Sequence, residues 1–568
     1  MQHRPKPVRL LAMSVVMAMV IAACTSADPD TTETTETTAA GGETTTSAGT
    51  DGTTTAPEAS GEKPVIVAAL GDTVNIIEPH TFRSTAAYAV TDALYEPLLE
   101  QVFEEQPDGL LLGSREEHVG AAAESYEIVE TDAGGLLATF NLRQDAMFTD
   151  GTPVTAEDFK YTFDRTILGP GYIGLLLPFI GIESPDQIRV IDDYTLEVEA
   201  NVQSPLFERF MTFQVFGAMN KALLEENAAA DDEWTFQYLA DKGAGAGVYT
   251  LDTYSPDSEV VLVPNPNYWD LENVANSGVT LRTVPDANQR ALLVQSGDID
   301  LATNIPPQLL AELEGDENVK IYSAPTTGVQ YMGMNQTIAP LDNVDVRRAI
   351  MHAVPYQALL DQVMFGYATP AAGVVTSTMD THDPEIGAQY ATDLEAAAQY
   401  LADSGVDEVN LELFVRDTNA SDQQAAVLIQ DNLRQVGINI EVTILPSADF
   451  SERLNAGEMP LFIHDWFSWG EDPFYQMRFL TTCGQFVNYS GWCNEDYDAL
   501  VEEGTFSLDP EVRADVSSQA QQIFFDNAIW APLWSADRTA VTGKCVTGLD
   551  RDYTLVPGFM YLTKTDSC

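Results

Sequence analysis

A pattern of strand, helix and strand in the second half of the chain constrains the fold more than any other feature of the sequence. Leu411–Val415 is short and apolar, and Ile438–Ile444 alternates apolar with polar residues, so both segments predict β-strands. Ser421–Val436 between them is typical of a helix, which Gly437 ends. Two strands joined in this way predict a parallel βαβ unit, and hence an α/β lobe.

The stretch Tyr126–Arg165 predicts a strand, a tight turn and a helix in close succession. Leu137–Leu142 is apolar, and Asp150-Gly151 supplies residues that tolerate a positive φ. The helix begins after Thr155, an N-cap residue that forms a capping box with Asp158. Its buried face is a stripe at a spacing of four residues, formed by Phe159, Phe163 and Ile167.

The length of the chain predicts more than one structural unit, and its charge argues against a nucleic-acid-binding protein. With 568 residues it is too long for one core, so we expect two or three structural units. Its 27 Lys and Arg residues face 87 Asp and Glu residues, which gives a net charge of −60. A surface of this charge repels phosphate and anionic lipid, so we expect no nucleic-acid partner.

The amino terminus carries the features of a secretion signal. Arg4, Lys6 and Arg9 precede the apolar run Leu10–Ala23, which is too short to span a bilayer and has the length of a signal-peptide core. The run ends at Cys24 in a string that resembles a bacterial lipobox. We therefore expect residues 1–23 to be removed and Cys24 to be lipidated.

A polar segment follows the expected lipidation site. Residues 24–63 are rich in Thr, Glu, Ala, Gly and Ser and contain almost no large apolar side chain, so they cannot bury enough surface to offset the entropy of ordering. We expect a disordered tether that holds a monomeric folded body outside the cytoplasmic membrane. Contact with the membrane would be by the lipid anchor only.

Several motifs resemble those of one family of receptors. The segment Phe148–Phe159, with Glu124-Ser125-Tyr126 and Thr139–Arg143 before it, resembles the signature of the family 5 extracellular solute-binding proteins, the oligopeptide, dipeptide and nickel receptors of ABC importers. Gly243–Tyr249 lacks a proline typical of the family, and its glycine spacing does not fit a dinucleotide site. Further matches occur in the family's order: Leu94–Leu99, Asp193–Leu196, Asn265–Trp269 and Asp345–Ile350.

The resemblance implies an α/β, two-lobe fold of the periplasmic-binding-protein type, with an extra subdomain on the first lobe. We expect lobe 1 to span residues 64–325, with the extra subdomain at about 100–185. Lobe 2 would span 326–526, and 527–568 would return to lobe 1. The lobe crossings are expected near Ala324–Val329 and near Phe525–Trp530.

The function implied is that of a receptor and not of an enzyme. It would capture a peptide-like solute between two lobes and deliver it to an ABC permease complex. An oligosaccharide or another non-peptide solute is the first alternative. A secreted hydrolase with Asp465 and Glu471 as its carboxylates is a lower alternative, since the sequence has no GxSxG or HExxH motif. A third alternative is a receptor or adhesin that closes its lobes in the same way but has no transport role.

Four cysteines remain after Cys24, and they allow three pairings. We expect the two shortest loops, Cys483 with Cys493 and Cys545 with Cys568, as structural disulfides. Neither pair has CxxC spacing, and the histidines are scattered. The sequence therefore predicts no metal site and no cofactor.

The segment His464–Pro473 is the richest local chemistry in the chain. It resembles the pattern W-x-x-D-Y-x-D-P of the peptide receptors, whose first aspartate pairs with the amino terminus of the peptide. Trp466 and Asp472 match, but Trp469 stands at the aspartate position. A buried ammonium needs a counter-charge. Either another acid replaces the aspartate, with Glu471, Asp465 and Asp472 as candidates, or the ligand has no amino terminus.

Other residues are weaker candidates for ligand contact. Trp466 and Trp469 could stack on a flat ligand face, although Trp466 fits a core position better. Arg416 could bind a carboxylate or form an exposed salt bridge. The remaining expected contacts are His464, Phe467, Tyr331 and the loop Pro79–Thr85.

Overall fold

The computed structural model describes residues 63–82, 84–106, 110–370, 372–549, 551–552 and 558–565. Gly61–Cys568 forms one compact unit. The expected signal peptide, Cys24 and tether lie outside the described residues. Among the described helices, none is long and apolar enough to cross a membrane.

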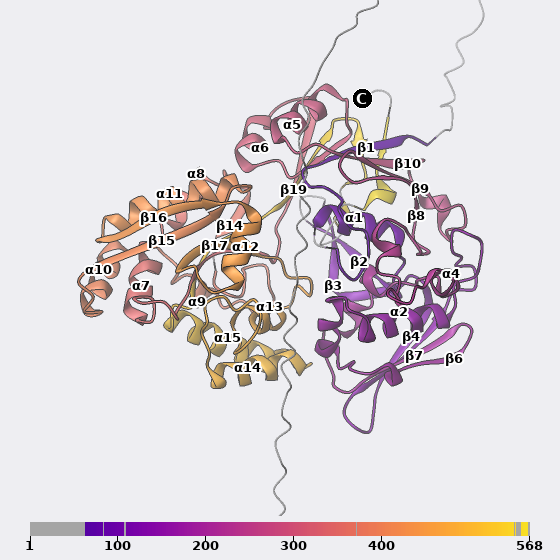
Figure 1. Cartoon of the computed structure of the whole chain (residues 1–568), viewed down its shortest axis with the longest axis horizontal. Helices are drawn as coiled ribbons and strands as arrows, with labels where there is room; N and C mark the ends of the chain where they lie inside the picture. The colour runs from indigo at the N-terminus through magenta and orange to yellow at the C-terminus, as the bar shows by residue number, and fades with distance from the viewer. Residues whose placement is uncertain are drawn as a thin grey trace, which may run out of the picture. The chain divides into compact units, whose positions relative to one another are not determined.

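A mixed seven-stranded sheet forms the centre of the first lobe (Figure 1). Strand β1 runs parallel to both of its neighbours, β10 and β11. The helices of this lobe are α1 (Thr85–Leu94), α2 (Ala156–Leu168), α3 (Phe207–Phe210), α4 (Lys221–Asn227), α5 (Ala287–Ser296) and α6 (Pro307–Leu313). The strands, in spatial order, are β12 (Val319–Ala324), β19 (Arg538–Gly543), β11 (Leu301–Thr303), β1 (Val65–Leu70), β10 (Gly278–Thr283), β9 (Glu259–Pro264) and β8 (Tyr249–Ser255).

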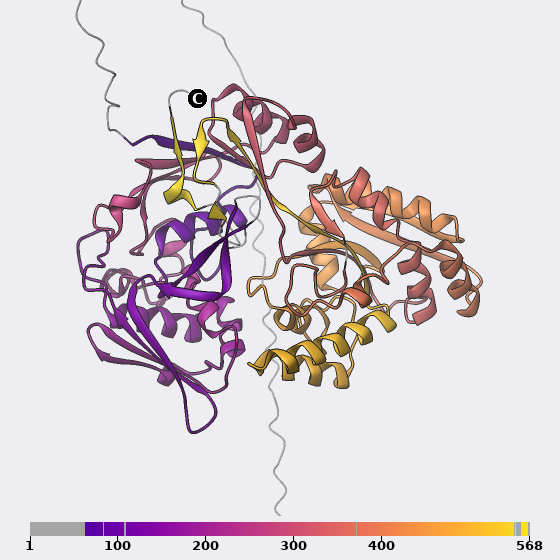
Figure 2. The ribbon, with the colours of Figure 1, turned by 180° about the vertical axis from the view of Figure 1, so that it is seen from behind.

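A six-stranded sheet forms the centre of the second lobe, drawn mainly in orange in Figures 1 and 2. Its strands, in spatial order, are β14 (Ala368–Pro370), β18 (Trp530–Ala536), β13 (Val329–Met334), β17 (Leu461–Trp466), β15 (Val409–Arg416) and β16 (Ile438–Leu445). Its helices are α7 (Val344–Ala353), α8 (Tyr356–Gln362), α9 (Pro384–Gly387), α10 (Leu394–Asp403), α11 (Ala420–Arg434), α12 (Ser447–Asn455), α13 (Pro473–Thr481), α14 (Glu495–Phe506) and α15 (Pro510–Asp526).

The predicted βαβ unit is confirmed in this sheet. Strands β15 and β16 pair in parallel along their whole length, from Val409 opposite Ile438 to Arg416 opposite Leu445, and α11 connects them. Gly437 has a φ of 88°, which suits a residue without a Cβ atom at the end of a helix.

The chain crosses between the two central sheets twice. The first crossing lies between β12 and β13, at residues 325–328, as expected. The return expected near Phe525–Trp530 is wrong, because Trp530–Ala536 pairs with β13 and β14 as β18 of the second sheet. This strand is buried along nearly its whole length, as a central strand is. Only after Asp537 does the chain join the first sheet, as β19.

The first lobe carries further sheets. One is the four-stranded order β4 (Ala123–Glu130), β5 (Leu136–Leu142), β7 (Thr195–Ala200) and β6 (Ile188–Asp192). Another is β2 (Leu99–Glu105), β3 (Leu111–Gly120) and β21 (Arg551–Asp552), and β20 (Val546–Thr547) pairs with β22 (Thr563–Lys564). The four-stranded sheet extends the expected subdomain beyond residue 185, since β7 fills the position between β5 and β6.

Helix α2 packs against β6 and β7 of the four-stranded sheet, and it begins with the turn and the capping box that the sequence predicts. Thr155 and Asp158 form the capping box, and Gly151 has a φ of 82° in the preceding turn. Phe159 and Phe163 are fully buried. The motif is therefore a structural element of the first lobe.

One predicted disulfide is formed and the other stays a prediction. Cys483 and Cys493 are bonded in the loop between α13 and α14. The second expected pair includes Cys568, which lies outside the described residues. The bond that is formed closes a short loop behind α13 and so supports the helix that follows the candidate site.

Candidate functional site

Residues 467–472, called the site loop below, connect strand β17 to helix α13. Asp472 is the N-cap of α13 and accepts hydrogen bonds from the backbone N–H groups of Phe474 and Tyr475. The carboxylate of Asp472 also pairs with Arg513 of α15, and both side chains are largely buried. Because Asp472 fixes the start of α13, its role in the structure is to hold the loop.

Glu471 links the site loop to the first lobe. Its side chain is 2% exposed and forms an ion pair with Arg209 of α3. A nitrogen of Arg115, in β3, lies 3.5 Å from the same carboxylate oxygen. Glu471 has a φ of 49°, a left-handed conformation that is costly for a residue other than glycine. The strained backbone and the buried charge are both compensated by this contact between the lobes.

Trp469 also reaches across to the first lobe. Its ring stacks on Phe82 with centroids 5.7 Å apart, and it meets Tyr88 and Tyr172 edge-on at 5.9 and 6.3 Å. Phe82 belongs to the loop Pro79–Thr85 that the sequence singled out. Burial raises the pKa of Tyr88 well above its ordinary value, so the phenol is neutral. Trp469 therefore sits in an uncharged aromatic wall.

Helix α13 extends the contact between the lobes. The ring of Phe179, in the first lobe, lies 5.0 Å from Tyr475 and 5.2 Å from Phe479. Tyr475 and Phe479 are buried in the same hydrophobic cluster as the first-lobe core. The two cores thus meet through aromatic side chains at the site loop and the first turns of α13.

Two buried polar groups at the start of the site loop lack partners. The Nε1 atom of Trp466 and the Oγ atom of Ser468 find no hydrogen-bond partner within the described part of the chain. The Trp466 ring packs 5.6 Å from Phe479. A buried polar group without a partner costs about 1–3 kcal/mol. Both atoms therefore keep an unused capacity for hydrogen bonds at this end of β17.

The other predicted contact residues lie elsewhere in the second lobe. Tyr331 is 3% exposed and packs 4.7 Å from Trp530, so its side chain belongs to the core. His464 lies among Phe450 and Tyr489, and burial lowers its pKa, which keeps it neutral.

Arg416 and Asp465 occupy an exposed position beside these core side chains. Their charged groups form an ion pair at 3.2 Å, with the Asp465 side chain 59% exposed, and Arg416 also packs over the ring of Phe450. Phe467 is exposed next to Gly328 at the first crossing. Of the eight predicted contacts, the site loop and the adjoining end of β17 thus bring together Trp466, Phe467, Trp469, Glu471 and Asp472.

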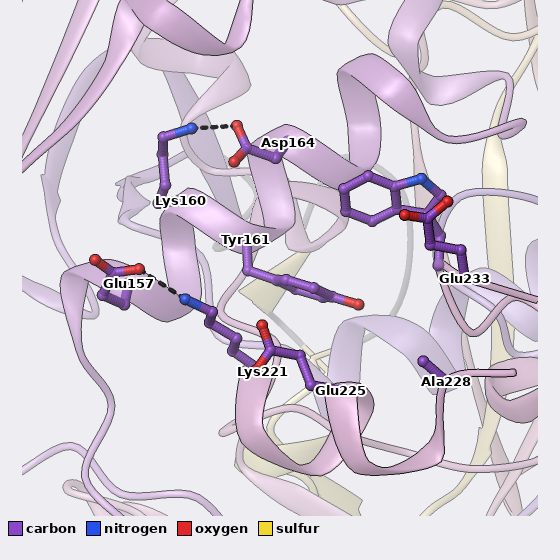
Figure 3. Close-up of a pocket in the computed structure, with 9 residues that line it drawn as sticks. Glu157, Lys160, Tyr161, Asp164, Lys221, Glu225, Ala228 and Glu233 are labelled. Carbon is purple, nitrogen blue, oxygen red and sulfur yellow. Dashed lines mark hydrogen bonds and ion pairs between the residues drawn. The ribbon is translucent and has the colours of Figure 1, made fainter. Parts of the chain in front are cut away.

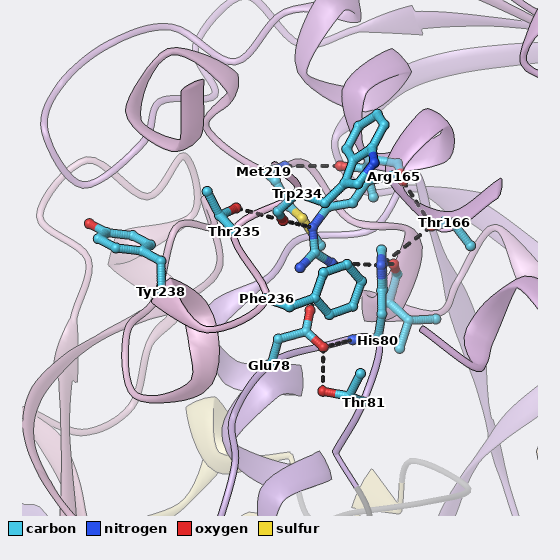
Figure 4. Close-up of polar contacts among 12 residues, drawn as sticks. Glu78, His80, Thr81, Arg165, Thr166, Met219, Trp234, Thr235, Phe236 and Tyr238 are labelled. Atoms are coloured by element: carbon cyan, nitrogen blue, oxygen red, sulfur yellow. Dashed lines mark hydrogen bonds and ion pairs between the residues drawn. The ribbon is translucent and has the colours of Figure 1, made fainter. Parts of the chain in front are cut away.

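A buried polar network holds the first-lobe side of the site (Figure 4). The Nε2 atom of His80 lies 2.8 Å from the carbonyl oxygen of Val215, and its Nδ1 atom lies 2.7 Å from Arg165. Arg165 forms an ion pair with Glu78 at 2.7 Å. Burial and the Arg165 charge lower the pKa of His80, so the ring is neutral, donating from Nε2 and accepting at Nδ1. The network fixes the loop that carries Phe82.

Sequence reasoning missed the first-lobe partners of the site loop. Arg115, Arg209, Tyr88 and Tyr172 are separated from the loop by more than 250 residues, and no local pattern marks them. The one available signal was the loop Pro79–Thr85, which supplies Phe82. Contacts between distant segments follow from the fold and not from spacing in the sequence.

A surface cavity of about 420 Å³ lies on the first lobe between α2 and α4 (Figure 3). Its two lysines are already paired, Lys160 with Asp164 and Lys221 with Glu157. None of the predicted contact residues lines this cavity. Within the described ranges, no group of three or more His, Cys, Asp or Glu side chains is placed to hold a metal ion.

The structure thus has two α/β lobes, and the site loop of the second lobe contacts the first. The chain belongs to the bacterial extracellular solute-binding proteins of family 5, because residues 117–488 match the family's model, described as "Bacterial extracellular solute-binding proteins, family 5 Middle". Proteins of this family bind solutes and are not enzymes. The alternative of a secreted hydrolase is therefore wrong, and its two carboxylates, Asp465 and Glu471, are held in ion pairs.

Individual relatives agree with this assignment. The chain is 28% identical over 417 residues to the probable D,D-dipeptide-binding periplasmic protein DdpA of Escherichia coli K12, covering 72% of this chain and 78% of that protein. It is 23% identical over 448 residues to the oligopeptide-binding protein OppA of Bacillus subtilis 168. This match covers 74% of this chain and 81% of that protein. The periplasmic binding protein DppA of Helicobacter pylori, solved with the peptide STSA, has the same fold, with a TM-score of 0.74 and 21% sequence identity. The superposition covers 88% of this chain and 98% of that one.

Replacing Glu471 with Gln should destabilise the protein. The substitution keeps the shape of the side chain and leaves Arg209 buried without its counter-charge, so we expect the free energy of unfolding to fall by about 3 kcal/mol. Asp465→Asn is the matched control, because the pair with Arg416 is exposed and should contribute less than about 1 kcal/mol. Urea denaturation of both variants measures the difference. Equal losses in the free energy of unfolding for the two variants would contradict a stabilising role of the buried ion pair.

Proposed function

We propose that this protein is an extracytoplasmic receptor that captures a peptide-like solute between its two lobes and delivers it to an ABC importer. The observation that carries the proposal is the pair of unsatisfied buried groups, Trp466 Nε1 and Ser468 Oγ, at the end of β17, where Trp466 packs against the cores of both lobes. An indole N–H requires an acceptor, and a hydroxyl can donate or accept. A peptide backbone supplies both kinds of partner within a short distance.

Binding would work by a shift in the populations of open and closed lobes. A ligand that contacts both lobes favours the closed arrangement by the difference between its affinities for the two states. The site loop is suited to this, since Glu471 and Trp469 already contact first-lobe residues. The relatives named for dipeptides and oligopeptides support a peptide-like solute for this chain as well.

A second candidate solute is an oligosaccharide or another amine-free molecule. The observation that favours it is the aromatic wall of Phe82, Tyr88, Tyr172 and Trp469, which carries no charge. Aromatic faces bind flat or apolar ligand surfaces well. A screen has to include both classes of solute.

We infer that a lipid on Cys24 anchors the receptor, and that the polar segment 24–63 acts as its tether. Replacing Cys24 with Ala should abolish labelling of the protein by radioactive palmitate in its native host and move it from the membrane fraction to the soluble fraction. Cys24→Ser serves as a second variant that also lacks the thiol. A Cys24→Ala protein that still carries label would contradict the anchor.

A thermal-shift screen of the purified full chain tests the solute class directly. Peptides of two to eight residues should raise the melting temperature, since a ligand at a hundredfold excess over Kd stabilises by about 2.7 kcal/mol. Oligosaccharides and metal chelates form the other arms of the screen.

A substitution then ties the binding to the candidate site. Trp466→Phe removes the unpaired N–H and keeps a ring, so we expect roughly tenfold weaker peptide binding. Trp492→Phe, in the core of the second lobe near Tyr497, is the matched control and should leave the affinity unchanged. Stabilisation by sugars alone would contradict the peptide assignment.

A further inference from the structure

Each carboxylate of the site loop and of the adjoining end of β17 already has a partner. Asp472 pairs with Arg513, and Asp465 with Arg416. Glu471 pairs with Arg209 and lies close to Arg115. The protein itself therefore neutralises every acid that was a candidate to receive a ligand amine.

The two buried pairs, those of Glu471 and Asp472, are difficult for a ligand to displace. The side chains of Glu471 and Arg209 are 2% and 3% exposed, and Asp472 is also engaged by two backbone N–H groups. Separating a buried ion pair leaves an uncompensated charge inside the protein. A ligand ammonium would have to take the place of a guanidinium that the fold holds in position.

Two arginines lie beside the carboxylate of Glu471. Two guanidinium groups, Arg115 and Arg209, approach the single carboxylate of Glu471. Arg115 is held in place from the second lobe as well, because its Nη1 atom donates to the carbonyl oxygen of Thr378 at 2.7 Å. An incoming ammonium would be repelled by these two guanidinium groups at the contact between the lobes.

Within the site loop and the aromatic wall that faces it, the groups left for a ligand are uncharged. They are the N–H of Trp466, the hydroxyl of Ser468 and the aromatic wall around Trp469. Neutral donors of this kind suit amide and acyl oxygens. They do not compensate the desolvation of an ammonium.

We propose that the solute has no ammonium group at the end that meets the site loop, as in an N-acylated, N-formylated or pyroglutamyl peptide. This inference rests on the proposed binding of peptide-like solutes and specifies their chemical class. Trp469 is then the residue that determines specificity. It places an indole in the first-lobe wall, where a carboxylate without a guanidinium partner would instead attract an amine.

One carboxylate of the first lobe could oppose this inference. Asp92 lies on α1 one turn after Tyr88, and burial raises its pKa to about 7. The approach of an ammonium would favour its ionised form. The test therefore includes Asp92→Asn.

The test compares pairs of peptides that differ only by an N-acetyl group. Isothermal titration of the full chain should show at least tenfold tighter binding for the acetylated member of each pair. Trp469→Asp introduces an unpaired carboxylate and should shift the preference by at least tenfold toward the free amine. Trp469→Asn introduces a side chain of the same shape as aspartate but without its charge. It should weaken the binding of both peptides in a pair by the same factor.

The outcomes separate this inference from the function on which it rests. Free-amine peptides that bind the wild-type chain as tightly as their acetylated partners, or more tightly, overturn the inference and leave the receptor function intact. Loss of that binding in Asp92→Asn would identify Asp92 as the amine partner. Binding of neither member in any pair overturns the peptide-receptor function, and the inference falls with it. If Trp469→Asp does not fold, the wild-type comparison decides.

Discussion

The buried ion pair between Glu471 and Arg209 is the interaction on which the arrangement of the site depends. It joins a loop of the second lobe to a short helix of the first, and neither charge is exposed to water. A charge removed from water is tolerated only with a partner at close range, so this contact fixes where the two lobes meet. The contact of Trp469 with Phe82 follows from the same placement of the loop.

Both sides of the contact are held by polar groups inside each lobe. In the second lobe, Asp472 caps α13 and pairs with Arg513. In the first lobe, Glu78, His80 and Arg165 fix the loop that presents Phe82 (Figure 4). A site held in this way loses little further freedom when a ligand binds, which favours affinity. We propose the unpaired groups of Trp466 and Ser468 as the specific contacts with the ligand.

Local patterns in the sequence predicted much of the fold and only half of the site. The βαβ unit around α11 and the capping box of α2 were predictable because they depend on neighbouring residues. The return strand β18 was misplaced, because an apolar run does not reveal which sheet will bury it. Tyr331 proved to be a core residue for the same reason. Arg115 and Arg209 could not be found, since their role arises only when distant segments fold together.

The most direct test of this account is the distance between the lobes measured by pulsed electron paramagnetic resonance. Spin labels are attached to non-canonical amino acids introduced at two exposed positions, Leu168 in the first lobe and Leu508 in the second. We predict a narrow, short distance distribution for the wild-type chain with its best peptide. We also predict a broader, longer distribution for Glu471→Gln. Identical distributions for the two proteins would contradict the claim that this ion pair sets the contact between the lobes.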